Sequence, residues 1–160
     1  MPSRKCDELT VTPSEATNDA TRREWRELGF FYDRDDAAKT WRLVGSRAGL
    51  LRFRDLLLAY SSGERNDLES EHEHYGPYMY LEIMTWHEAG FDEHAIRGPL
   101  PELNRLANLI ESKIAAVQAG ATIMIQSEYS PGSPYALVLE VREDGFDPAE
   151  ADSGLSKEVG

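Results

Sequence analysis

The chain has 160 residues, of which 41% are hydrophobic and 29% are charged. A chain of this length can bury about 70% of its unfolded surface as one domain, and this apolar content is too high for a disordered protein. The single cysteine excludes an internal disulfide. Because no run approaches the roughly 20 apolar residues of a membrane helix, and no secretory signal is recognisable, we expect a cytoplasmic protein that does not cross a membrane.

The formal net charge of −12 is unevenly distributed along the chain. The first 60 residues have a net charge of +1 and the last 100 a net charge of −13. This imbalance argues against direct nucleic-acid binding, because phosphate backbones are bound by Lys and Arg. It suits a basic protein partner instead, although an acidic surface also keeps a protein soluble without any partner.

The N-terminal part predicts a polar leader followed by a β-hairpin and a helix. The leader spans 1–21, and within it Leu9–Thr12 has the pattern of one edge strand. Aromatic runs at 28–32 and 40–44 flank a polar stretch and predict a hairpin. Ser46 then predicts the N-cap of a helix whose apolar residues recur every three or four positions.

The middle of the chain predicts one strand between two acidic loops. The loops cover 63–74 and 87–98. A strand is predicted over 78–86, and its side chains alternate between two faces. One face carries Glu82 together with three aromatic side chains and a methionine. These side chains are Tyr78, Tyr80, Met84 and Trp86.

The C-terminal part predicts a helix over 101–119 and a hairpin of strands over 121–127 and 135–141. The last strand is almost continuously apolar, which predicts a central position in a sheet. The element order predicts an α+β fold: a two-layer, mainly antiparallel sheet of about five strands with two helices on one face. We expect a single domain over 22–142 and an acidic flexible tail over 143–160.

All four histidines fall within 23 residues, and two of them form the pattern Glu-His-Glu-His. In an extended chain His72 and His74 project to the same side and can share a metal ion. This pattern predicts a metal site, and with it a metal-dependent enzyme as an alternative function. The competing interpretation is a hydrated loop whose imidazoles bond to neighbouring carboxylates. Serine-nucleophile and nucleotide-binding motifs are absent from the sequence, and we expect no cofactor.

The predicted strand and its acidic flanks also resemble a protein-binding surface. Aromatic side chains dominate the binding energy of interfaces, and charges at the rim orient the partner. Tyrosine is equally a good strand former, and this face could instead be covered by the leader. The residues predicted to contact a partner are Glu71, Glu73, Tyr78, Tyr80, Trp86, Glu88, Asp92 and Glu93.

Several soft motifs resemble those of a known family. They are a Gly-Leu-led helix from Gly49, a segment with histidines at 72 and 74, the strand at 80–83 and a Leu-rich strand at 137–141. In this respect the chain resembles small immunity proteins of bacterial polymorphic toxin systems. The resemblance implies a cytoplasmic protein that neutralises a cognate toxin by binding it, with no catalytic residue. A further alternative is a structural or regulatory homo-oligomer that pairs through strand edges or the aromatic face.

Overall fold

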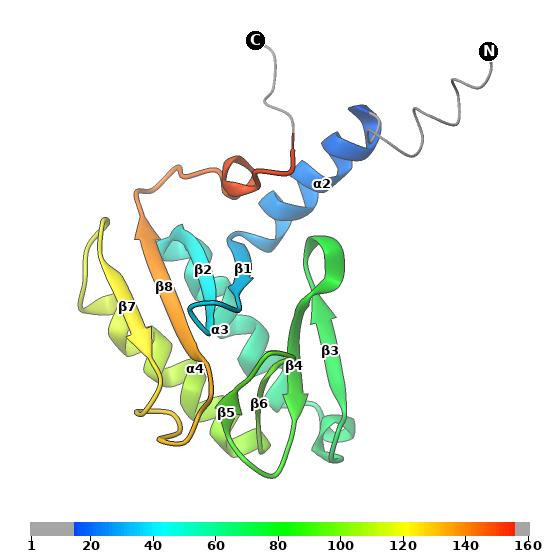
Figure 1. Cartoon of the computed structure of the whole chain (residues 1–160), viewed down its shortest axis with the longest axis vertical. Helices are drawn as coiled ribbons and strands as arrows, with labels where there is room; N and C mark the ends of the chain where they lie inside the picture. Colours follow the sequence, from blue (N-terminus) through cyan, green and yellow to red (C-terminus); the bar gives the residue numbers. More distant parts are fainter. Residues whose placement is uncertain (1–14, 156–160) are drawn as a thin grey trace, which may run out of the picture.

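The computed structural model describes residues 15–155, which form three helices and two mixed four-stranded sheets (Figure 1). The predicted single sheet of five strands, with two helices, is therefore wrong, although the α+β class is confirmed. The predicted strand at Leu9–Thr12 lies outside the described residues. No helix within 15–155 has the length and apolar character that crossing a membrane requires.

The first sheet contains β1 (Phe31–Asp35), β2 (Thr40–Ser46), β8 (Ala136–Arg142) and β7 (Thr122–Ile125), in the order β1-β2-β8-β7. The antiparallel β1–β2 and β7–β8 pairs confirm that both predicted hairpins form, but β1 begins at Phe31, three residues after the predicted start at position 28. β8 lies inside the sheet, as its apolar sequence predicted. Its partner β2 runs parallel to it, so this sheet is mixed.

The second sheet contains β3 (His72–Tyr75), β4 (Leu81–Thr85), β6 (Ile96–Gly98) and β5 (Gly90–Phe91), in the order β3-β4-β6-β5. Three of these strands lie where the sequence predicted loops. They have two to four residues each and are rich in charge and glycine, so they carry almost no alternating pattern. Their pairing depends on β4, whose own alternation is clear.

Helices α3 (Arg47–Ser61) and α4 (Leu100–Ala115) pack against each other and lie behind the strands in Figure 1. The Ser46 hydroxyl accepts the Gly49 N–H at 3.0 Å, which confirms the predicted N-cap. The two helices bury apolar stripes of three-to-four-residue spacing in the core that both sheets share. The fully buried members of these stripes include Leu50, Phe53, Leu57, Leu103, Leu106 and Ile110.

The third helix, α2 (Glu15–Leu28), begins inside the predicted polar leader. Its buried face consists of Asn18, Arg22 and Trp25, of which only Trp25 is apolar. The sequence therefore lacks the repeat of apolar residues every three or four positions that indicates a helix. The Trp25 ring packs on Phe31, with ring centroids 4.8 Å apart. α2 also contacts a 3-10 turn at 148–151, in which Pro148 and Ala149 are buried, within the segment whose composition predicted a flexible tail.

Candidate functional site

The β3–β4 pair presents a polar face to solvent. In the antiparallel register His72 lies opposite Met84, and His74 lies opposite Glu82. Since paired residues project to the same side of a sheet, these four side chains share one face. The alternate positions of β4 face the core and are buried; they are Leu81, Ile83 and Thr85. The alternation predicted for the strand is thus confirmed over 81–85.

Both imidazoles on this face are held by backbone carbonyl groups. His72 Nδ1 lies 3.0 Å from the Ser70 carbonyl oxygen, and His74 Nδ1 lies 3.0 Å from that of Met79. A carbonyl oxygen can only accept, so each Nδ1 carries the proton and donates it. In the neutral rings Nε2 therefore keeps a free lone pair.

Glu82 joins the two histidines. One donor atom of each of the three side chains lies within 4.8 Å of the other two, and Glu82 Oε1 is 3.9 Å from His74 Nδ1. The spacing of His72 and His74 predicted that they share one side of the chain, and the predicted metal site did not include Glu82. The chain reversal before β4 brings Glu82 back, because it sets position 82 opposite position 74.

That reversal is the 76–80 turn (Gly76–Tyr80), in which Gly76, Tyr78 and Met79 all have positive φ, of 76°, 67° and 60°. Residues other than glycine rarely adopt a positive φ. This backbone conformation costs of order 1–3 kcal/mol for each such residue. The predicted strand over 78–86 is therefore wrong at its start: β4 begins at Leu81, and Tyr78 and Tyr80 belong to the turn.

Two residues that are far from the 76–80 turn in the sequence hold it in place. The Tyr32 hydroxyl donates to the Pro77 carbonyl and accepts the Tyr80 N–H at 3.1 Å. The Tyr78 hydroxyl donates to Asp152 at 2.7 Å. Burial raises the pKa of Tyr32, so its hydroxyl stays protonated. For Tyr78, burial and the hydrogen bond to Asp152 raise the pKa together.

Although its backbone is fixed, the 76–80 turn exposes three large side chains. Tyr78 is 51% exposed, Met79 58% and Tyr80 69%. Near the other end of β4, Trp86 is half-buried and its ring centroid lies 4.7 Å from that of His87. Among the predicted acidic contacts, Glu73 and Glu88 are exposed and Glu71 is half-buried.

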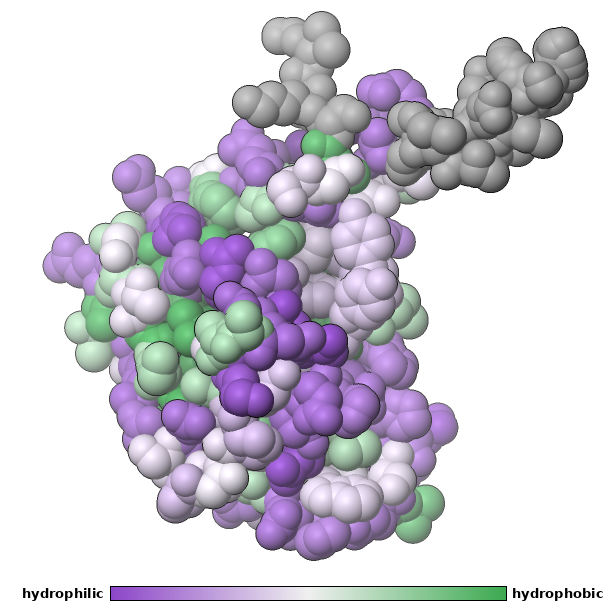
Figure 2. All heavy atoms as spheres, viewed as in Figure 1, coloured by the Kyte–Doolittle hydropathy of each residue, from purple (hydrophilic) through white to green (hydrophobic). Residues whose placement is uncertain are grey.

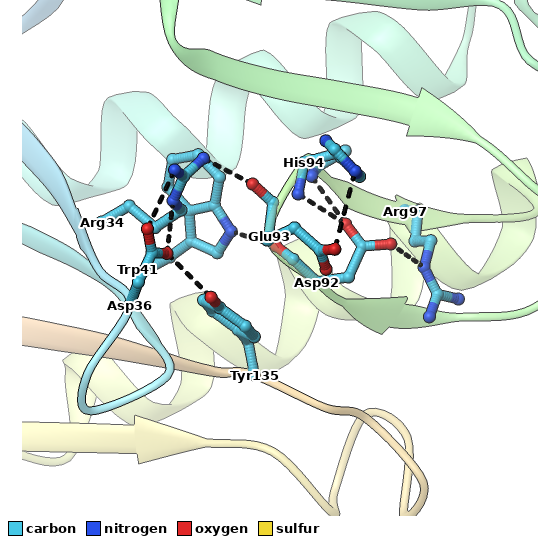
Figure 3. Close-up of polar contacts among 9 residues, drawn as sticks. Arg34, Asp36, Trp41, Asp92, Glu93, His94, Arg97 and Tyr135 are labelled. Atoms are coloured by element: carbon cyan, nitrogen blue, oxygen red, sulfur yellow. Dashed lines mark hydrogen bonds and ion pairs between the residues drawn. The ribbon is translucent and has the colours of Figure 1, made fainter.

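Asp92 has a structural position in the loop that joins β5 to β6, at the edge of the sheet opposite β3 (Figure 3). Its carboxylate accepts the backbone N–H groups of His94 and Ala95 and the Nε–H of Arg97, all at 2.9 Å. Burial alone would raise the pKa of Asp92, but these hydrogen bonds outweigh it and lower that pKa. The Asp92 carbonyl also accepts the Trp41 indole N–H at 2.8 Å.

The neighbouring Glu93 takes part in the same connection between the sheets (Figure 3). Arg34 on β1 donates to the Glu93 carbonyl and pairs with Asp36 at 2.7 Å, and Asp36 in turn accepts the Tyr135 hydroxyl. The structure thus separates Asp92 and Glu93 from the β3 edge, although the sequence grouped them with the tyrosines. The exposed Glu93 side chain still faces solvent.

Negative charge surrounds the β3–β4 pair. From Glu64 to Glu88 the chain contains seven carboxylate side chains and a single arginine. That arginine is Arg65, whose side chain is 85% exposed. Its Nη2 atom lies 3.9 Å from Oε2 of Glu71. In Figure 2 hydrophilic colours dominate the right-hand side of the molecule, where β3 and β4 lie.

Compared with protein families, curated proteins and solved structures, the chain matches none of them.

Proposed function

We propose that the protein is a non-enzymatic binding domain that holds a basic protein against the β3–β4 side of the molecule. The observation that carries this proposal is the 76–80 turn, which exposes Tyr78, Met79 and Tyr80 on a backbone fixed by hydrogen bonds. Large, exposed aromatic side chains are the usual centres of binding energy in interfaces. Because this backbone is already ordered, binding loses little conformational entropy there.

Charge identifies the kind of partner. The excess of carboxylates between Glu64 and Glu88 favours a cationic surface, since complementary potentials speed encounter and penalise wrong partners. Glu71, Glu73 and Glu88 form the acidic rim in this proposal, with Trp86 at the far end of β4. Asp92 does not belong to this rim, because its carboxylate is already bound by Arg97 and two backbone N–H groups.

The resemblance of the helix and strand motifs to immunity proteins supports a narrower version, in which the basic partner is a cognate toxin. An acidic protein can occupy the basic cleft of a nuclease and block it. In this version the chain binds and inhibits without any catalytic residue of its own.

The test begins with a tagged chain in its native host, with capture at low and high salt and identification of the bound protein. The affinity of the purified partner is then measured for the wild type and for Tyr80→Ala. We expect Tyr80→Ala to weaken binding at least about 30-fold, a loss of about 2 kcal/mol, as for a central aromatic residue.

Met124→Ala is the matched control, because Met124 is 58% exposed on β7 of the other sheet. We expect this variant to bind like the wild type. Equal weakening by both substitutions, or binding that is indifferent to salt, would contradict the proposal.

A further inference from the structure

We infer that His72, His74 and Glu82 form a binding site for one divalent transition-metal ion, with Zn²⁺ as the best match. The three side chains come from two neighbouring strands of one sheet face, where His74 and Glu82 are directly paired. One donor atom of each lies within 4.8 Å of the other two. Donor atoms around one zinc ion lie about 3.4 Å apart, given bonds of about 2.0 to 2.1 Å. Metal binding therefore requires these side chains to rotate until their donor atoms reach this spacing.

The surroundings of the two histidines match those of metal ligands. A histidine that binds a metal through one ring nitrogen usually donates the other N–H to a backbone carbonyl or a carboxylate, which fixes the ring and its tautomer. His72 makes this bond to Ser70 and His74 makes it to Met79, both at 3.0 Å. Each Nε2 is thereby left with a free lone pair for a metal ion. The His74 nitrogen that lies 3.9 Å from Glu82 Oε1 is Nδ1, so binding through Nε2 requires the His74 side chain to turn.

The donor set selects the class of ion. Two imidazole nitrogens and one carboxylate suit Zn²⁺ and its transition-metal neighbours, whereas Mg²⁺ and Ca²⁺ prefer oxygen ligands throughout. Three protein ligands leave a fourth position of a tetrahedral ion open. Because both histidines are exposed, this position faces solvent and can take a water molecule or a side chain from a bound protein.

The site is also connected to the 76–80 turn. The Met79 carbonyl that orients His74 belongs to this turn, so an ion on His74 restrains the segment that exposes Tyr78 and Tyr80. The metal site does not depend on the proposed partner binding, since all three ligands and both carbonyl groups belong to this chain.

The test uses the metal alone. The protein is stripped with a chelator, and Zn²⁺ binding is measured by titration calorimetry, with Co²⁺ absorption as a second probe of tetrahedral coordination. We expect one ion per chain, no stoichiometric binding by the double variant His72→Ala, His74→Ala, and at least about tenfold weaker binding by Glu82→Gln. Zn²⁺ should raise the unfolding temperature of the wild type but not that of the double variant.

The matched control is His87→Ala with His94→Ala, which removes the same number of imidazoles outside the cluster. We expect it to bind Zn²⁺ like the wild type. Thermal unfolding in chelator, where all variants should match the wild type, separates lost ligands from lost folding. Failure of the wild type to bind one ion, or an equal loss in the control, would overturn the inference and leave the partner-binding proposal intact.

Discussion

At the scale of single residues, Tyr32 links the core to the exposed surface. Its ring is 4% exposed, and its hydroxyl contacts both the Pro77 carbonyl and the Tyr80 N–H. One buried side chain therefore makes two of the hydrogen bonds that hold the 76–80 turn. Nothing in the local sequence around Tyr80 indicates this, because Tyr32 is 48 residues away.

Tyr32→Phe removes this hydroxyl and leaves two backbone groups without their partner. We expect the free energy of unfolding to fall by about 1–3 kcal/mol, the usual cost of unpaired polar groups in a protein interior. Denaturant unfolding measures this loss. Tyr75→Phe is the control, because the Tyr75 hydroxyl makes no hydrogen bond within residues 15–155 and its removal should change stability little. Equal stabilities of the two variants would contradict the role given to Tyr32.

At the scale of elements, the sequence predicted those parts whose residues alternate or repeat clearly. Ser46 and the apolar spacing behind it predicted α3, and the run at 135–141 predicted the central strand. α2 was missed because its buried face is mostly polar, and β3 because it consists of charged and polar residues. The site was predicted in part: the spacing of His72 and His74 is local, whereas Glu82 joins them only through the strand register.

Gly76 tests whether the 76–80 turn depends on its unusual backbone. It has a φ of +76°, and a Cβ there would lie 2.8 Å from side-chain atoms of Leu28 and Tyr32. Gly120 has a φ of +98° with open space around its Cβ position. We expect Gly120→Ala to cost about 1–2 kcal/mol for the backbone alone, and Gly76→Ala to cost more because it adds the steric clash. Denaturant unfolding of both variants compares the costs, and equal costs would show that the packing around Gly76 relaxes freely.

At the scale of the whole molecule, the two sheets are joined by polar contacts as well as by the common core. The Trp41 indole donates to the Asp92 carbonyl, and the Ser133 hydroxyl accepts the Phe91 N–H at 2.8 Å. Asp92 also organises the β5–β6 loop through its carboxylate. The junction therefore depends on a carboxylate that must stay ionised.

This junction predicts a loss of stability in acid. The hydrogen bonds to Asp92 lower its pKa in the folded state below the ordinary value of 3.8. The stability that they contribute is present above that ordinary value and is lost as the pH falls through the lower folded-state pKa. We expect Asp92→Asn to be less stable than the wild type at pH 7 and to lose less stability on acidification. Unfolding free energies measured from pH 7 to pH 2 check this, and parallel curves for the two proteins would contradict it.

The position of β3 at the end of its sheet has a consequence for the protein at high concentration. The outer backbone of a terminal strand is a template on which another chain can add, and apolar strands at such positions start aggregation. Here that place is occupied by His72, Glu73 and His74, all exposed. A second copy aligned along β3 would bring like-charged carboxylates together and strip water from polar rings. Two of the proposed metal ligands, His72 and His74, therefore also disfavour fibril-like polymerisation through this edge.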